Sequence, residues 1–413
     1  MTRRLIPILI LSVSVVACGG EPQTTSPAPE ATAPSHGALD RGLLVAMAVL
    51  GRTPDGKPQT LPARLGLLTR GDDGWAYREI EDPDSNVFHK AMVYRPRPDG
   101  PGGILTAGGT GAFLKWWVPG AKPEVLWSED FGGKTSRMRD IETGDLDGDG
   151  VEEIAVATHD QGIVAVVDPT DDGGWNVTKL DHRPGIFVHE IELGDLDDDG
   201  TLEIYATPST PNKLDGSPQP GWVTRYVPAT GEGPTDVVDL GTDHAKEILV
   251  DDVDGDGTDE LYVSVEAVSG GRVRILRVEA DTDPAAAPVI ATLDDTLTRF
   301  LTAGDIDGDG DREMVAAGKS SGLWLLRPGA DPNGPWVMTS IDRDSGGFEH
   351  AALLTDLDGD GIDELYVADD DDHEINRYVW ADGTFVRETL YTHPDGLSGF
   401  TWNLMPAPVA LMP

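Results

Sequence analysis

The chain repeats one short acidic motif five times, and this repeat is the strongest constraint on its fold. Each copy has the pattern Asp-x-Asp-x-Asp-Gly-x-x-Glu and is followed directly by an apolar run. The first aspartates of successive copies lie 50, 57, 53 and 51 residues apart, and they are Asp145, Asp195, Asp252, Asp305 and Asp356. A unit of about fifty residues that recurs in this way predicts a repeat architecture.

The spacing of the acidic residues predicts a calcium site in each copy. Alternate residues of a tight turn can direct three carboxylates to one point, and calcium accepts about six to eight oxygen ligands in flexible geometry. Glycine at position six permits a backbone conformation that other residues disfavour. Position seven varies, which fits a ligand supplied by a backbone carbonyl, and glutamate at position nine completes the set.

We therefore expect about five bound Ca²⁺ ions, one for each loop. The predicted ligands are Asp145, Asp147, Asp149, Val151, Glu153, Asp195, Asp197, Asp199, Thr201, Glu203, Asp252, Asp254, Asp256, Thr258, Glu260, Asp305, Asp307, Asp309, Asp311, Glu313, Asp356, Asp358, Asp360, Ile362 and Glu364. An EF-hand is excluded because position twelve is Val or Ala inside a strand-like run, where an EF-hand requires Glu. A metal-free acidic turn is one alternative, since Asp and Gly are ordinary turn residues. Magnesium is the other, but it fits less well because it prefers stricter geometry and keeps its waters.

Each repeat contains four short strand-like segments, which favours an all-β, seven-bladed β-propeller. In one repeat these segments are 138–144, 154–158, 163–167 and 175–180, separated by turns rich in Gly and Asp. We expect one propeller over residues 38–413, with repeats near 88–136, 137–187, 188–243, 244–297, 298–347 and 348–397 and a split blade from 398–413 plus 38–87. Pairing of the carboxy-terminal strand with amino-terminal strands is expected to close the ring and to remove exposed sheet edges.

These units resemble the FG-GAP or VCBS repeat family, the calcium-loop propeller blades of integrin α-subunits and many bacterial surface proteins. The resemblance covers roughly residues 88–405 and rests on the loop spacing. Glu instead of Asp at position nine differs from the integrin pattern and is more similar to bacterial members. In the family, the first strand of each blade is innermost, so the resemblance implies the same arrangement here.

The amino terminus predicts export and lipid anchoring. Arg3 and Arg4 precede an apolar run from Leu5 to Ala17, so residues 1–17 are expected to be a signal peptide. The sequence Val15-Val16-Ala17-Cys18 resembles the lipobox of bacterial lipoproteins, which implies lipidation of Cys18. Residues 18–37 then form a flexible tether rich in Pro, Ser and Thr. The resemblance implies a protein anchored to the bacterial cell envelope, at the outer membrane, on its periplasmic or surface side.

The composition narrows the possible partners. The formal net charge is −42, so nucleic acid is excluded as a partner, because phosphate binding requires a basic surface. With one cysteine, Cys18, the chain forms no internal disulfide, and bound calcium offers another means of stabilising the folded form. We expect a monomer.

A second regularity lies six residues before each loop, before the degenerate copy of the motif that begins at Arg95, and at the comparable place in the last repeat. These positions carry cationic or imidazole side chains, with an aromatic residue in the last repeat: His89, Arg139, His189, Lys246, Arg299, His350 and Trp402. By the family resemblance they lie near one mouth of the central channel and could bind a carboxylate-bearing ligand such as an acidic sugar. Ion pairs with neighbouring carboxylates are the alternative interpretation. His89 and His189 could also bind a transition metal or act in acid–base chemistry.

The sequence favours a non-enzymatic binding module for polysaccharide or an envelope or surface protein. A polysaccharide lyase that uses the channel His and Arg residues is the alternative, and a scaffold subunit of an envelope complex is the third hypothesis. None of the short motifs typical of serine hydrolases, zinc proteases or phosphate-binding loops is present in the sequence.

Overall fold

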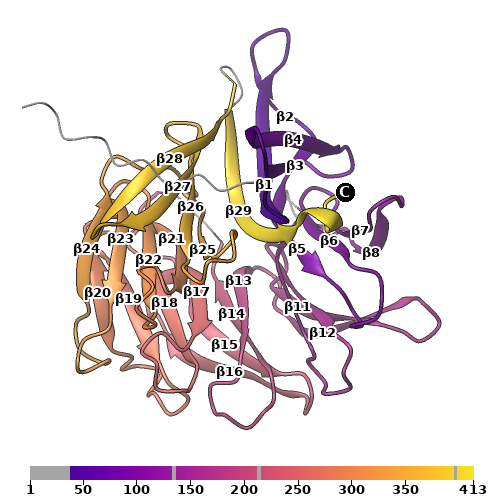
Figure 1. Ribbon diagram of the computed structural model, residues 1–413. Helices are drawn as coiled ribbons and strands as arrows, with labels where there is room; N and C mark the ends of the chain where they lie inside the picture. The colour runs from indigo at the N-terminus through magenta and orange to yellow at the C-terminus, as the bar shows by residue number, and fades with distance from the viewer. Residues whose placement is uncertain (1–37, 133–135, 212–214, 395–397) are drawn as a thin grey trace, which may run out of the picture. The chain divides into compact units, whose positions relative to one another are not determined.

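The computed structural model describes residues 38–132, 136–211, 215–394 and 398–413, and nearly all of its regular structure is β-strand (Figure 1). The strands form seven antiparallel sheets arranged in a ring, a seven-bladed β-propeller. The predicted fold class is confirmed. The predicted signal peptide, Cys18 and the tether lie outside the described residues. Within the described part, no helix is long and apolar enough to cross a membrane.

Six blades each consist of four consecutive strands. Blade 1 contains β5 (Phe88–Tyr94), β6 (Gly103–Gly108), β7 (Phe113–Trp117) and β8 (Glu124–Ser128). Blade 2 contains β9 (Met138–Gly144), β10 (Glu153–Thr158), β11 (Ile163–Pro169) and β12 (Trp175–His182). Blade 3 contains β13 (Phe187–Gly194), β14 (Glu203–Ser209), β15 (Trp222–Val227) and β16 (Glu232–Asp239).

The chain continues through the second half of the ring in the same way. Blade 4 contains β17 (His244–Asp251), β18 (Glu260–Glu266), β19 (Val273–Val278) and β20 (Val289–Leu293). Blade 5 contains β21 (Thr298–Gly304), β22 (Glu313–Gly318), β23 (Gly322–Arg327) and β24 (Val337–Asp342). Blade 6 contains β25 (Ala352–Thr355), β26 (Glu364–Asp369), β27 (Glu374–Ala381) and β28 (Thr384–Thr392).

The seventh blade combines strands from both ends of the described chain. β29 (Ser398–Pro408) pairs with β1 (Arg41–Arg52), which pairs in turn with β3 (Ala63–Gly71) and, at its end, with β2 (Pro58–Thr60). β4 (Gly74–Asp82) is the outer strand of this blade, and the 3₁₀ turn η1 (Val409–Leu411) follows β29. The antiparallel register of β1 and β29 runs from Arg41 opposite Pro408 to Leu50 opposite Ser398.

The first strand of each complete blade lies innermost, and β29 takes this place in the split blade. The innermost strands contact one another in a closed cycle, in the order β29, β5, β9, β13, β17, β21, β25 and back to β29. The second strands, such as β10, are buried along their whole length because a neighbouring blade covers each face. Outer strands such as β12 alternate between half-buried and exposed residues, since one face contacts solvent.

Seven apolar clusters of described residues lie between the blades, and each joins two neighbours in the ring. For example, Ile154 and Val156 of blade 2 pack against Leu105 and Leu114 of blade 1. The acidic loops contribute to these clusters through position two, which is always apolar and buried. The five residues at this position are Leu146, Leu196, Val253, Ile306 and Leu357. Each loop is therefore attached to the interface with the following blade.

We predict that Leu404→Ala destabilises the protein by about 2–5 kcal/mol. Leu404 of β29 lies opposite Val45 of β1 and is buried in the cluster between blade 6 and the split blade. The free energy of unfolding, measured by chemical denaturation, tests this value. Val409→Ala is the matched control, because the Val409 side chain is 38 % exposed and its truncation should cost less than about 0.5 kcal/mol. Equal effects of the two substitutions would contradict the proposed importance of this closing strand.

Candidate functional site

The five acidic loops connect the first and second strands of blades 2 to 6 and share one backbone arrangement. In every loop the first aspartate accepts a hydrogen bond from the N–H of the glycine at position six; the N···O distances are 2.7–3.0 Å. These glycines have φ between +84° and +95°, a conformation that residues with a Cβ rarely adopt. The N–H at position seven donates to the aspartate at position five, for example from Val151 to Asp149 at 2.8 Å.

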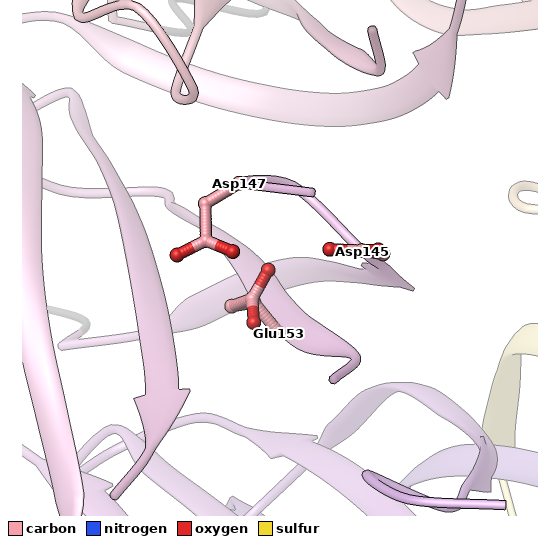
Figure 2. A group of neighbouring side chains, drawn as sticks. All are labelled: Asp145, Asp147 and Glu153. Atoms are coloured by element: carbon pink, nitrogen blue, oxygen red, sulfur yellow. The ribbon is translucent and has the colours of Figure 1, made fainter. Parts of the chain in front are cut away.

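In each loop, three of the predicted carboxylate ligands come together, with oxygen atoms within 4.8 Å of one another. Positions one and three contribute in all five loops. Position nine contributes the third group in the loops that begin at Asp145, Asp252 and Asp305, and position five contributes it in the other two. Figure 2 shows the first loop, where the carboxylates of Asp145, Asp147 and Glu153 face the same space.

An arginine on the third strand of the blade lies beside four of the five loops, and sequence reasoning missed these residues. Arg277 lies 2.7 Å from Asp254 and 2.8 Å from Glu260, positions three and nine of one loop. The same two positions are paired in the other three loops by Arg225, Arg327 and Arg377. The arginines follow the loop glutamates at separations that vary with the intervening turns, so no fixed sequence spacing reveals them.

The first loop is different because no arginine of its third strand, β11, pairs with its carboxylates among the described residues. Glu153, which is 2 % exposed, accepts one hydrogen bond at Oε2 from the N–H of Leu146, at 2.7 Å. Its Oε1 atom is buried and has no hydrogen-bond partner. Burial, reinforced by the charges of Asp147 and nearby aspartates, raises the pKa of Glu153 to about 7, and burial raises the pKa of Glu260 and Glu364 to about 7 as well. A buried carboxylate oxygen without a partner is costly, and a bound cation would remove that cost.

The donor set of these loops fits calcium. All side-chain donors are carboxylate oxygens, the ligands that hard divalent cations prefer. In the arginine-bearing loops, Asp254 and Asp307 each use Oδ2 for the guanidinium and keep a buried Oδ1 without a hydrogen-bond partner. An ion and the arginine can therefore share the same aspartate in these two loops.

Five blades contribute to a cavity where their innermost strands meet, and we call it the axial cavity. It has a volume of about 160 Å³ and is lined by Arg137, Arg139, His159, His189, Lys246, Arg299, Phe348 and Trp402. A smaller neighbouring cavity shares Arg139, Lys246, Arg299 and Trp402 and adds His89 together with several carboxylates. Of the seven residues predicted to lie near the channel, six therefore line these two cavities.

His350 is the seventh, and it does not line either cavity. Its imidazole is buried outside them, with Nδ1 2.7 Å from the carbonyl oxygen of Gly318 and Nε2 2.8 Å from Oγ of Ser345. It precedes β25, which begins at Ala352, and has a left-handed backbone with φ of +54°. The preceding residue, Glu349, lines the smaller cavity instead.

Arginine side chains cover the aromatic rings of the axial cavity. The guanidinium carbon of Arg139 lies 4.9 Å from the ring centroid of Trp402, and that of Arg299 lies 4.2 Å from the centroid of Phe348. Such cation–π contacts hold the guanidinium groups in place. The rings thus position the charges of the cavity, and stacking of a sugar on the covered faces would require the arginines to move.

The cationic groups of the axial cavity differ in their ion pairing. Arg137 and Arg139 have no carboxylate within 4.0 Å among the described residues, whereas Arg299 is paired with Glu266 and Glu349. The sequence left two interpretations of these residues, a site for a carboxylate-bearing ligand and a set of internal ion pairs. The structure lies between them, since some of the cationic residues form ion pairs and others do not. Lys90, which lines the smaller cavity, is paired with Asp140 and Glu142.

Two histidines of the axial cavity are held in the neutral form. Burial and the nearby charge of Lys246 lower the pKa of His189 well below its ordinary value. Burial and the neighbouring arginines also lower the pKa of His159, whose ring centroid lies 5.2 Å from that of His189. His189 Nε2 is buried without a hydrogen-bond partner. His159 belongs to the turn after β10, and no pattern in the sequence singled it out.

Comparison with known proteins supports the fold. No protein-family model matches the chain, and no curated protein matches it by sequence. Among solved structures, a protein from Lactobacillus plantarum is 13 % identical with a TM-score of 0.52, and the alignment covers 90 % of this chain and 99 % of that one. The BP39L lectin from Burkholderia pseudomallei is 12 % identical with a TM-score of 0.50, with 85 % and 99 % covered. The Dos1 propeller is 8 % identical with a TM-score of 0.50, with 84 % of each chain covered. At these identities the similarity shows the propeller fold alone.

The raised pKa of Glu153 predicts a pH-dependent stability in the absence of calcium. A carboxyl whose pKa is higher in the folded state than the ordinary value of 4.5 contributes stability that is present below about pH 4.5 and is lost as the pH rises through about 7. In EGTA, the free energy of unfolding of the unmodified protein should therefore fall more between about pH 5 and about pH 8 than the free energy of unfolding of the Glu153→Gln variant. Chemical denaturation at several pH values measures both slopes. Glu129→Gln, an exposed glutamate paired with Lys179, is the control and should keep the original slope. Identical slopes for all three proteins would show that Glu153 is not strained in the metal-free state.

Proposed function

We propose that this protein is a calcium-binding β-propeller that captures an anionic ligand in the axial cavity. The observation that carries the proposal is the convergence of arginines from blades 2 and 5 on one cavity, with Arg137 and Arg139 lacking carboxylate partners within 4.0 Å among the described residues. In a protein with a net charge of −42, such a positive site is a local exception. Calcium would stabilise the blades around the site, and the ligand would bind at their centre.

The calcium part of the proposal is supported most strongly by the first loop. Its carboxylates converge as in the other loops, yet no arginine neutralises them, and Glu153 Oε1 is buried without a partner. The other four loops already hold one guanidinium each. We infer that the first loop has the greatest need for a cation and binds calcium most tightly, and that the others bind it more weakly.

We predict that Asp147→Asn removes the tightest calcium site and reduces the stabilisation that calcium provides. At a calcium concentration about 100 times the dissociation constant, one site stabilises the folded protein by about 2.7 kcal/mol. Isothermal titration calorimetry after EGTA treatment gives the number and affinity of the sites, and thermal melting gives the stabilisation. Asp99→Asn is the matched control, because Asp99 lies in the corresponding loop of blade 1, where Arg95 and Arg97 replace two of the aspartates. Absence of calcium binding in the unmodified protein would refute this part of the proposal.

The chemistry of the axial cavity favours a carboxylate-bearing ligand. Guanidinium groups bind carboxylates through charge-assisted hydrogen bonds, and enclosure strengthens these bonds by excluding water. The covered aromatic faces argue against recognition by stacking alone. An acidic sugar at the end or branch of a polysaccharide, or an acidic side chain of an envelope protein, has the required charge.

The cellular setting is part of the same proposal. The basic residues Arg3 and Arg4, the apolar run that follows and the lipobox-like sequence before Cys18 support export and lipid anchoring to the bacterial cell envelope. Extracellular calcium modules have dissociation constants of about 10⁻⁴–10⁻³ M, which suits a compartment rich in calcium. The FG-GAP or VCBS resemblance of the loops agrees with this setting.

We predict that the protein binds oligosaccharides that contain uronic acids and does not bind neutral oligosaccharides of the same length. Loss of a charge-assisted hydrogen bond costs about 1.5–3 kcal/mol, so Arg139→Gln should weaken binding by about tenfold to a hundredfold. Arg343→Gln is the matched control, since Arg343 also lies over a tryptophan, 4.1 Å from the ring centroid of Trp324, but does not line the axial cavity. Calorimetric titration measures both affinities. Equal binding of acidic and neutral sugars, or equal effects of the two substitutions, would contradict the proposed site.

One observation favours a lyase as the second candidate function. Neutral His159 and His189 lie beside unpaired arginines, so a base and a group that neutralises a carboxylate are present in one cavity. β-Elimination from a uronate requires both. Ultraviolet absorbance of unsaturated products, measured with the same acidic oligosaccharides, separates this activity from binding alone.

A further inference from the structure

Lys246 differs from the other buried lysines among the described residues. Lys90 contacts two carboxylates, and Lys115 lies 2.8 Å from Asp82 and 2.6 Å from Asp84. Lys246 is 5 % exposed, and its Nζ has one described carboxylate neighbour, Oε2 of Glu266, at 3.8 Å. The first two amines lie in close ion pairs, whereas the amine of Lys246 has no carboxylate nearer than 3.8 Å among the described residues.

The carboxylate of Glu266 is already engaged by other groups. Its Oε2 lies 2.8 Å from Nε2 of His244, and its Oε1 accepts a hydrogen bond from Nε of Arg299 at 3.0 Å. Although burial opposes the effect, the charges of Arg299 and Lys246 hold the pKa of Glu266 below its ordinary value, so this carboxylate is ionised but shared. Lys246 therefore shares the charge of Glu266 with His244 and Arg299 and is the most distant of the three groups, at 3.8 Å.

The position of Lys246 also allows it to contact a ligand that enters the cavity. Lys246 lines both the axial cavity and the smaller neighbouring one, at the level of Arg139 and Arg299. Burial lowers the pKa of Lys246 to about 8, and the charge of Arg299 adds to this effect while Glu266 opposes it. A desolvated lysine beside another cation is the arrangement that makes a lysine amine nucleophilic near neutral pH.

We propose that Lys246 condenses with small carbonyl compounds that carry a carboxylate, and so forms an imine inside the axial cavity. The lone pair of the neutral amine forms a bond to the carbonyl carbon, and the C=O π pair moves to oxygen. That oxygen gains a proton as nitrogen loses one, which gives a carbinolamine. Loss of water then leaves the C=N bond, so that amine and carbonyl are converted to imine and water without an oxidant or reductant.

The choice of a carboxylate-bearing carbonyl compound rests on the proposed function, because Arg137 and Arg139 would bind the carboxylate. The volume of about 160 Å³ accommodates a compound of a few carbon atoms beside these arginines. The reactivity of the amine itself depends only on Lys246, Glu266 and Arg299. The two parts can therefore fail separately.

Reductive trapping tests the proposal on the full chain with glyoxylate as the probe. Glyoxylate at limiting concentration and cyanoborohydride convert each imine into a stable carboxymethyl-lysine, and peptide mapping by mass spectrometry gives the rate at each lysine. We expect Lys246 to be modified at least about tenfold faster than Lys57 and Lys179, which are more exposed and ion-paired. Simple burial predicts the opposite order, so modification of Lys246 at an equal or lower rate overturns the proposal.

Two further experiments test why Lys246 reacts quickly with glyoxylate. The fast phase of modification should disappear in Lys246→Arg, which keeps the charge, and persist in the matched variant Lys179→Arg. If Lys246→Arg does not fold, the peptide map of the unmodified protein still decides.

Sulfate should slow the reaction of Lys246 with glyoxylate by competing for the arginines, and acetaldehyde, which lacks a carboxylate, should react more slowly. Fast reaction with both aldehydes and no protection by sulfate would overturn carboxylate recruitment, and the proposed function with it, but not the reactivity of the amine. Binding of acidic sugars without modification of Lys246 would overturn this inference alone.

Discussion

Apolar packing between neighbouring blades is continuous around the ring because β29 lies between β1 and the innermost strands of blades 6 and 1. Without this strand, β1 would expose a sheet edge, and two of the seven interblade clusters would lose residues such as Leu404 and Ala407. Every other blade depends on two neighbours for burial of its central strands, since no blade has an apolar core of its own. Closure therefore converts a row of weak units into one cooperative fold.

The acidic loops combine two opposing requirements in nine residues. Position two is apolar and buried in the interface with the next blade, whereas positions one, three, five and nine bring carboxylates together. Burial of the glutamate at position nine makes its charge costly. In four blades an arginine on the third strand forms an ion pair with this glutamate. In the first loop no described cationic side chain pairs with this glutamate. We therefore expect the loops to differ in their affinity for calcium.

The sequence was sufficient to predict the seven blades because the repeat spacing, the four strand-like segments and the turn residues all indicate the same architecture. It also located six residues of the two central cavities, since equivalent positions on innermost strands must converge in a ring. Arg277 and the three equivalent arginines could not be predicted from spacing, because their distance from the loop glutamate changes with each turn. His350 was placed by register, but β25 starts two residues later, so the side chain is directed elsewhere. Phe348 and Arg137 precede their strands and were invisible to a pattern based on strand positions.

Trp402 belongs to β29, the strand that also completes the split blade. The wall of the axial cavity and the closing strand are therefore supplied by the same segment, which a ribosome makes after all the complete blades. A nascent chain can fold its early blades, yet it acquires a finished cavity only when the ring is sealed. Competence to capture a ligand thus coincides with completion of the fold, so partly synthesised or unsealed chains would not compete with mature protein for the ligand.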